Sequence, residues 1–142
     1  MSDGRDVLIA LAREACTRAY APYSGIHVGA AIRAASGALY GGTNVENAAY
    51  PLGNCAEASA IAAGVAAEGA AFRIAETAVW AIDRDGKLIA ISSCGGCRQR
   101  IREFAESGQV LVHFPWQGAE FQTVTVDALL PYAFELPGTR GP

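Results

Sequence analysis

The sequence predicts an α/β fold, a three-layer α-β-α sandwich with a mixed sheet of about five strands. Two short strands joined by a tight turn come early, and helices then alternate with apolar runs of strand length. A hairpin favours antiparallel pairing, whereas strands linked by helices favour parallel pairing. A mixed sheet covered by helices on both faces follows. The chain has 142 residues, of which 51% are hydrophobic, so we expect one domain over residues 1–142.

The first helix is predicted from apolar residues that recur at steps of three and four. They are Val7, Leu8, Leu11, Ala12, Ala15 and Ala19. Ser2 or Asp3 is in position to cap this helix at its start. The segment at residues 21–25 ends it, because Pro22 disfavours helical geometry in the residue before it.

The remaining elements are predicted from apolar runs bounded by turn residues. Strands are expected at residues 26–35, 39–43, 74–82, 110–114 and 121–124, with a short extended piece at 88–91. Helices are expected at residues 55–67 and 98–107, with a helical turn at 127–130. The helix at 55–67 is almost entirely apolar, which is typical of a buried helix. The last residues, rich in glycine and proline, are expected to be frayed.

The composition argues against two classes of partner. The net charge is −3 and the basic residues are scattered, which argues against a nucleic-acid polymer. No stretch approaches the roughly 18 apolar residues of a membrane-spanning helix. Residues 1–13 carry acidic side chains and lack the pattern of a secretory signal. We therefore expect a cytoplasmic protein that acts on a small molecule and not at a membrane.

Three of the four cysteines form the pattern that carries chemistry. Cys55 stands at the start of one predicted helix, and Cys94 and Cys97 stand just before another. Helix starts favour thiolates, because free N–H groups and the helix dipole stabilise negative charge there. Cys94 and Cys97 are three residues apart, so one helical turn directs both to the same side. Three thiolates with a free fourth position predict a catalytic zinc ion.

Two points stay open when only these residues are considered. Glu57 is two residues from Cys55, about 200° around a regular helix, so helical geometry does not place both on one face. Its charge alone also fits an ordinary first helical turn. A C-x-x-C pair occurs in redox dithiols and structural zinc sites as well. A structural site, in a zinc-stabilised binding protein, would need a fourth ligand, and only Cys16, His27 and His113 are available.

The chain resembles the small homotetrameric zinc-dependent cytidine deaminases, and the matching motifs span nearly its whole length in family order. The matching stretches are Ala21-Pro22-Tyr23-Ser24, Val28-Gly29-Ala30-Ala31, Gly42-x-Asn44-Val45-Glu46-Asn47-Ala48-x-Tyr50-Pro51-x-Gly53-x-Cys55-Ala56-Glu57, Cys94-Gly95-x-Cys97-Arg98-Gln99, Glu103-Phe104 and Leu129-Leu130-Pro131-x-x-Phe134.

The resemblance implies a reaction and the residues that perform it. Cys55, Cys94 and Cys97 would be the ligands of one zinc ion per chain. Glu57 would take a proton from the zinc-bound water and pass it to N3 of the cytosine ring. The hydroxide would attack C4, and Glu57 would then protonate the amino group, which leaves as ammonia. The implied reaction converts cytidine and deoxycytidine to uridine and deoxyuridine, a step of pyrimidine salvage.

The resemblance also implies contacts with the nucleoside. Asn44 and Glu46 would hydrogen-bond the ribose hydroxyl, and the backbone of Ala56 would help hold the base. In this family the sites lie at contacts between the subunits of the homotetramer. Tyr50 and Phe134 match positions that reach a neighbour's site.

Four departures from the family pattern leave the substrate open. Ile26 stands where an aromatic ring usually packs on the base, which loses about 1 kcal/mol of stacking. Ala58 stands where an arginine is common near the thiolates, and Arg98 is the residue that would offset their charge instead. Ser93 replaces the usual proline before the first cysteine of the pair, and His27 places an imidazole beside the stacking position. The alternative function is the same chemistry on another amino-substituted base or nucleoside.

Overall fold

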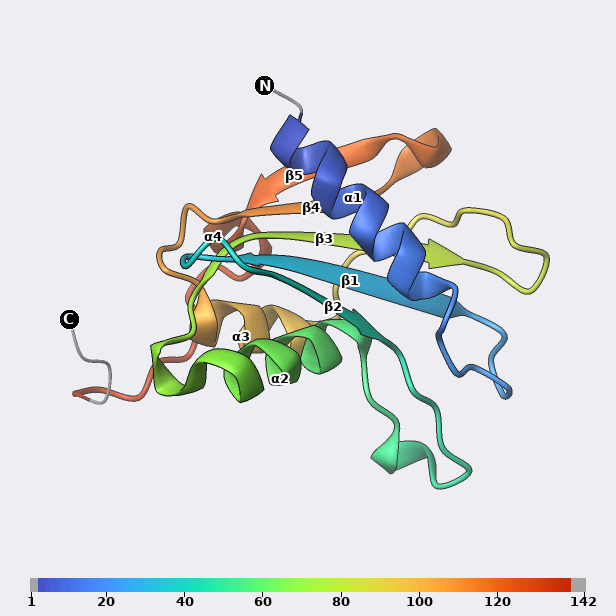
Figure 1. The fold of residues 1–142 in the computed structure, drawn as a ribbon, viewed down its shortest axis with the longest axis horizontal. Helices are drawn as coiled ribbons and strands as arrows, with labels where there is room; N and C mark the ends of the chain where they lie inside the picture. Colours follow the sequence, from blue (N-terminus) through green and yellow to red (C-terminus); the bar gives the residue numbers. More distant parts are fainter. Residues whose placement is uncertain (1–2, 139–142) are drawn as a thin grey trace.

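Residues 3–138 are described by the computed structural model, in which a five-stranded sheet lies between layers of helices (Figure 1). The helices are α1 (Asp3–Cys16), α2 (Ala56–Glu68), α3 (Gly95–Phe104) and α4 (Val126–Leu129). The strands are β1 (His27–Ala34), β2 (Leu39–Thr43), β3 (Ile74–Ile82), β4 (Leu111–Pro115) and β5 (Phe121–Thr125). Within the described residues, no helix has the length and apolar character needed to cross a membrane.

The sheet order is β2-β1-β3-β4-β5. The early hairpin β1–β2 is antiparallel, as are β1–β3 and β4–β5, while β3 and β4, which α3 connects, are parallel. In Figure 1, α1 crosses one face of the sheet, and α2 and α3 lie together on the other. This arrangement confirms the predicted three-layer sandwich with a mixed sheet.

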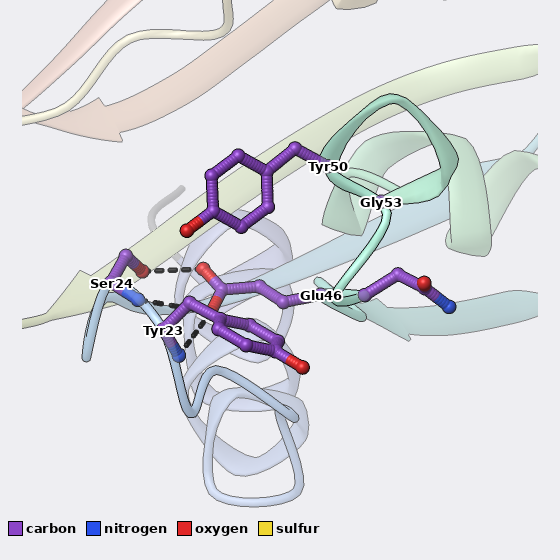
Figure 2. A pocket seen from close by; sticks show the side chains of 6 residues that line it. Tyr23, Ser24, Glu46, Tyr50 and Gly53 are labelled. Atoms are coloured by element: carbon purple, nitrogen blue, oxygen red, sulfur yellow. Dashed lines mark hydrogen bonds between the residues drawn. The ribbon is translucent and has the colours of Figure 1, made fainter.

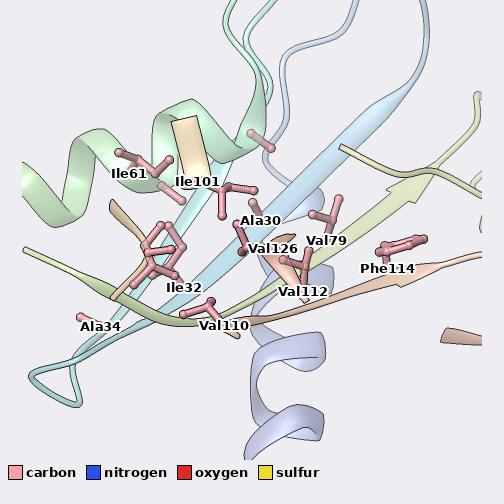
Figure 3. Close-up of a cluster of buried hydrophobic side chains, with 14 of the residues drawn as sticks. Ala30, Ile32, Ala34, Ile61, Val79, Ile101, Val110, Val112, Phe114 and Val126 are labelled. Atoms are coloured by element: carbon pink, nitrogen blue, oxygen red, sulfur yellow. The ribbon is translucent and has the colours of Figure 1, made fainter. Parts of the chain in front are cut away.

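Alternate residues of the strands face different helical layers, because successive side chains of a strand point to opposite sides. On β1, Ala30 and Ile32 belong to the larger apolar cluster, which also takes in α2 and α3 (Figure 3). Ala31 faces the other way and packs in a smaller cluster with Leu8 and Ala12 of α1. The two helices that carry the cysteine clusters therefore share one face of the sheet.

Gly29 allows α1 to approach β1 closely. A Cβ atom on Gly29 would lie 1.9 Å from the Ala12 carbonyl oxygen and 2.5 Å from the Cys16 backbone nitrogen. We expect Gly29→Ala to lower the free energy of unfolding by roughly 3 kcal/mol, because backbone atoms cannot yield without shifting the helix. Urea denaturation measures this. Gly41→Ala is the matched control, since its Cβ would first meet α1 side chains at 3.7 Å. An equal loss in both variants would contradict the close-approach argument.

Three helix ends lie three residues from the sequence-based expectation. One of them is the end of α3, which is at Phe104 and not at residue 107, because Ala105 forms a bridge with Ile74. α1 ends at Cys16 although its apolar pattern continues to Ala19, because Tyr20 is drawn into a bridge with Val45. α3 begins at Gly95, three residues before the predicted start at residue 98, since the two glycines after its N-cap already form the first helical turn. Long-range pairing and cap geometry therefore decided these ends, where local pattern did not.

Two expectations concern the ends of the chain. Of the two predicted caps, Ser2 lies outside the described residues, and Asp3 is already the first residue of α1. The prediction of a frayed last segment falls on residues 139–142, which lie outside the described residues. The short extended piece at 88–91 bonds to the C-terminal ends of two inner strands. Ile89 N–H donates to the Ala81 carbonyl of β3 at 3.0 Å, and Ile91 N–H donates to the Pro115 carbonyl of β4 at 2.9 Å.

Candidate metal centre and active site

The three predicted ligand cysteines meet at the N-termini of α2 and α3. Cys55 is the N-cap of α2 and Cys94 the N-cap of α3, both with extended backbone (φ/ψ −78°/154° and −65°/166°). Cys97 lies in the first turn of α3, and the three sulfur atoms all lie within 4.8 Å of one another. A tetrahedral zinc ion with Zn–S bonds of about 2.3 Å would hold its sulfurs roughly 3.8 Å apart. The donor set therefore fits zinc.

The surroundings of the three thiols differ, and the difference leaves one side of the cluster open. Cys97 is buried, Cys55 is half-buried and Cys94 is exposed. Burial raises the pKa of the Cys97 thiol, with the charge of Glu57 adding to it, and burial also raises the pKa of Cys55. Backbone N–H groups of the first α3 turn, that of Cys97 above all, lower the pKa of Cys94. The thiols of Cys55 and Cys97 therefore need a nearby cation, such as a bound metal ion, before they lose their protons.

Glu57 lies beside these thiols with a side chain that is 6% exposed. On a regular helix it would point about 200° away from Cys55. Cys55, however, is an N-cap with extended backbone, so its side chain does not follow the helical wheel. The Ser93 hydroxyl donates a hydrogen bond of 3.1 Å to Glu57 Oε1. The structure thus brings the carboxylate and the cysteine cluster together, which spacing alone did not predict.

A cavity of about 340 Å³ opens onto this cluster and is lined by Cys55, Glu57 and Cys94. Its volume lies in the range of small-molecule sites, roughly 300–1,000 Å³. The predicted substrate-contact residues that line it are Asn44, Glu46, Tyr50 and Ala56. Two residues of the cysteine cluster, the buried carboxylate of Glu57 and these four residues therefore line the same cavity, which is large enough for a small molecule.

Two predicted contact residues, Ile26 and Phe134, do not line this cavity in a single chain. Their side chains are 39% and 69% exposed, and Val28 supplies an apolar part of the lining instead. The Phe134 carbonyl oxygen accepts a hydrogen bond of 3.0 Å from Gln99 Nε2, which ties the C-terminal segment to α3. The backbone of this segment is thus held, while the ring stays available to another surface.

The Asn44 side chain holds the start of β1. Its Oδ1 accepts a hydrogen bond of 2.8 Å from the Val28 N–H, and its Nδ2 donates one of 2.9 Å to the Ile26 carbonyl oxygen. Both ends of the amide are therefore engaged with backbone. An amide fixed in this way presents its remaining hydrogen and lone pair in a constant direction at the edge of the cavity.

The Glu46 carboxylate faces the segment that precedes β1 (Figure 2). Its Oε1 accepts from the backbone N–H groups of Tyr23 at 2.9 Å and Ser24 at 3.1 Å, and its Oε2 accepts from the Ser24 hydroxyl. That hydroxyl is the main cause of the lowered pKa of Glu46. A second hollow of about 370 Å³ lies here and shares Glu46, Tyr50 and Gly53 with the first. The shared lining residues place the two cavities next to each other.

Arg100 is the cation in contact with a predicted ligand thiol, which corrects the expectation that Arg98 fills this role. The Arg98 guanidinium donates to oxygens of residues 92–93 and of α4. Arg100 Nη1 lies 3.5 Å from Cys97 Sγ. A Cβ atom on Gly96 would lie 3.3 Å from the same nitrogen, so the glycine leaves room for the guanidinium. The sequence did contain the signal, because residues three apart on a helix are neighbours.

We expect Arg100→Gln to weaken zinc binding by about tenfold. Three thiolates around a divalent cation leave a net negative charge, and groups just outside a metal's ligands typically change its affinity by about 10- to 100-fold. Competition with a chromophoric chelator measures the dissociation constant. Arg18→Gln is the matched control. Arg18 pairs with Glu14 on the surface after α1, so this substitution removes the same charge far from the cluster. Equal affinities in the two variants would contradict this role of Arg100.

The residues that a closed, four-ligand site would require lie elsewhere. Cys16 Sγ donates a hydrogen bond of 3.2 Å to the His27 carbonyl oxygen. His113 lies on the α1 face of the sheet, 2.8 Å from Thr123 Oγ1 and 2.7 Å from Glu76 Oε1. Among residues 3–138, the cysteine cluster contains neither histidine and lacks Cys16. Within that range, the arrangement is that of a three-cysteine centre.

Comparisons with known proteins were made on sequence and on structure. A family model described as the zinc-binding region of cytidine and deoxycytidylate deaminases matches residues 3–113. A cytidine deaminase of Sporosarcina psychrophila is 39% identical over 127 residues, which cover 89% of this chain and 88% of that protein. A cytidine deaminase of Halalkalibacterium halodurans is 37% identical over 130 residues, which cover 92% and 93%.

Solved structures agree with the sequence matches. The crystal structure of cytidine deaminase from Burkholderia pseudomallei has a TM-score of 0.78 and 36% identity, covering 91% of this chain and 98% of its own. That of the Mycobacterium tuberculosis enzyme has a TM-score of 0.74 and 32% identity, covering 93% and 98%. The matched family region contains the whole cysteine cluster described above. The cluster of Cys55, Cys94 and Cys97 is positioned to bind a metal ion, and the chain belongs to the cytidine and deoxycytidylate deaminase family.

Proposed function

We propose that the protein catalyses the hydrolytic deamination of cytidine and deoxycytidine to uridine and deoxyuridine, with release of ammonia. The observation that carries this proposal is the buried carboxylate of Glu57 beside three clustered thiols, at a cavity of nucleoside-compatible size. Relatives that are more than a third identical over most of their length are named cytidine deaminases. One zinc ion per chain is the proposed cofactor.

The chain's own residues divide the work between binding and proton transfer. Cys55, Cys94 and Cys97 would hold the zinc ion, and the exposed side at Cys94 leaves access for water and substrate. When bound, zinc lowers the pKa of a water molecule, so that a nucleophile is available near neutral pH. Glu57 accepts one proton of the attacking water and delivers it to ring atom N3. It then takes the proton of the new hydroxyl on C4 and passes it to the amino group, which leaves as ammonia while the C4 carbonyl forms. Ala56, buried at the start of α2, lines the cavity where its backbone would hold the base.

The proposed ribose contacts are compatible with the bonds that Asn44 and Glu46 already make. An ionised carboxylate has about four acceptor positions, and three donors from residues 23–24 occupy the Glu46 group. One position remains for a ribose hydroxyl. Asn44 likewise keeps one amide hydrogen and one lone pair beyond its two backbone bonds. In this proposal the part of the cavity at Asn44 and Glu46 receives the sugar, and the part at the cysteines receives the base.

We also propose that the protein is a homotetramer in which the sites lie at subunit contacts. Support comes from large apolar side chains left open on a single chain, such as Tyr50 at 75%, Leu52 at 72% and Phe134 at 69% exposure. Exposed apolar groups of this size are typical of interaction surfaces. Light scattering of the zinc-loaded protein would give the mass of four chains, and a monomer mass would contradict the proposal.

The proposed setting of the reaction is cytoplasmic pyrimidine salvage, without a nucleic-acid polymer or a membrane as partner. All four cysteines are free thiols in the structure, and free thiols persist in reducing compartments. A reducing compartment also suits the proposed zinc site, because three thiolate ligands require that their cysteines stay reduced.

A substrate panel tests the proposed function against its alternative, the same chemistry on another amino-substituted base or nucleoside. The wall of the cavity favours the alternative. Among its described lining residues Tyr50 is the single aromatic one, and the branched aliphatic ones are Val28, Val45 and Ile91. Zinc-loaded protein is assayed for ammonia release from cytidine, deoxycytidine, free cytosine and aminopurine nucleosides. The highest kcat/KM on the first two supports the proposal, whereas no turnover of either contradicts it.

A further inference from the structure

Ser93 is a buried polar residue that the mechanism above leaves without a role. Its side chain is 4% exposed, and its hydroxyl donates to Oε1 of Glu57, which is 6% exposed, across 3.1 Å. The two residues come from different parts of the chain, one just before α3 and the other in the first turn of α2. A hydroxyl has one hydrogen to donate, and here the carboxylate receives it.

The backbone of Ser93 is held by a single guanidinium. Arg98 Nε donates to the Ser93 carbonyl oxygen at 2.8 Å, its Nη2 donates to the Ser92 hydroxyl at 2.9 Å, and its Nη1 donates to the Leu129 carbonyl oxygen at 2.9 Å. The rigid fork of an arginine thus joins the segment before α3 to the end of α4. All three guanidinium nitrogens of Arg98 are thus engaged, two with residues 92–93 and one with Leu129, and none bonds a thiol.

We propose that Ser93 is a positioning residue that orients the Glu57 carboxylate for proton transfer, and that Arg98 fixes Ser93 in turn. A carboxylate that moves protons between water, ring and amino group must keep one orientation, since misplacement by about 1 Å lowers rates severely. The Ser93 hydrogen bond holds Oε1, so the proposal assigns the proton transfers to Oε2. A buried carboxylate also requires a hydrogen-bond donor, and Ser93 provides one. This inference rests on the proposed deamination.

The experiment compares Ser93→Ala and Ser93→Thr with the unaltered protein, all loaded with zinc. Steady-state kinetics on cytidine give kcat and KM, and zinc content and thermal unfolding are measured on the same samples. We expect Ser93→Ala to lose about tenfold in kcat with KM within twofold, because a hydrogen bond to a charged group is lost while substrate contacts remain. Ser93→Thr, which keeps the hydroxyl, should retain at least three times the kcat of Ser93→Ala.

Ser36→Ala is the matched control at the other end of α2. The Ser36 hydroxyl donates to Glu68 Oε2 at 2.8 Å on the exposed surface, so the same serine–glutamate bond is removed away from the site. Its kcat should equal that of the unaltered protein. The inference is overturned if Ser93→Ala keeps its kcat within twofold, if Ser93→Thr is equally impaired, or if zinc content falls in parallel with kcat. Failure of the unaltered protein to deaminate any nucleoside would instead overturn the proposed function.

Discussion

Replacing Glu57 with glutamine is expected to leave zinc bound and to lower kcat on cytidine by about a thousandfold or more. A general acid–base group contributes typically 10²- to 10⁴-fold, and Glu57 is proposed to serve in more than one transfer of the same turnover. Glutamine has nearly the same shape but cannot accept and return a proton. Its Oε1 can still accept the hydrogen bond of Ser93, so the fold around it should be kept.

Metal content and turnover, measured together, test this prediction. Zinc per chain is determined by metal analysis after loading, and kcat by the loss of cytidine absorbance. Glu68→Gln is the matched control, because Glu68 ends the same helix and accepts bonds from Ser36 and Tyr40 outside the cavity. It should retain both zinc and activity. A Glu57→Gln variant that turns over cytidine within tenfold of the unaltered protein would remove Glu57 from its proposed role.

Cys97→Ala is expected to lose stable zinc binding, on the order of a thousandfold in affinity, and with it all measurable deamination. Only a few metal–ligand bonds supply the free energy of zinc binding at a thiolate site. The loss of one ligand therefore removes a large part of that free energy. Cys97 is the most deeply buried of the three, and among the described residues the group with ligand atoms within 4.8 Å of one another has only these three members.

Chelation and reconstitution measure the effect of this substitution. Unaltered protein stripped by a chelator should lose activity and regain it when zinc is returned, whereas Cys97→Ala should regain none. Cys16→Ala is the matched control, since Cys16 is equally buried but bonds to the His27 carbonyl oxygen away from the cluster. Retention of one zinc ion per chain by Cys97→Ala would show that the metal is held by other groups.

The order of helices and strands could be predicted from the sequence because it depends on local periodicity. The run at residues 74–82 became β3 with the predicted bounds, and the apolar segment after Cys55 became α2 up to its closing glycine. The end of α1 and the start of α3 could not be predicted in the same way. A bridge between Tyr20 and Val45 and the cap geometry of Cys94 decided them, and both depend on contacts or backbone angles that a sequence window does not contain.

The hydrogen-bond partners of the site residues also could not be predicted from the sequence. Asn44 and Glu46 were expected from the resemblance to contact the ribose, yet the bonds that they make to residues 23–28 became visible only in the structure. The exchange of roles between Arg98 and Arg100 has a similar cause. Both are helical residues close to Cys97, and which of them reaches a thiol depends on where the segment before α3 and the end of α4 place their oxygens.

By itself, the sequence determined the class of the fold and the three-thiol centre, because cysteine spacing and helix starts are local properties. The resemblance assigned Glu57 to the site, and only the tertiary structure showed how Glu57 comes to lie beside the cysteines. Its spacing from Cys55 points away on a regular helix, and the extended backbone of the Cys55 N-cap removes that conflict. The structure also decided that Ser93 holds the carboxylate, because two segments 36 residues apart in the sequence must meet for that hydrogen bond to form.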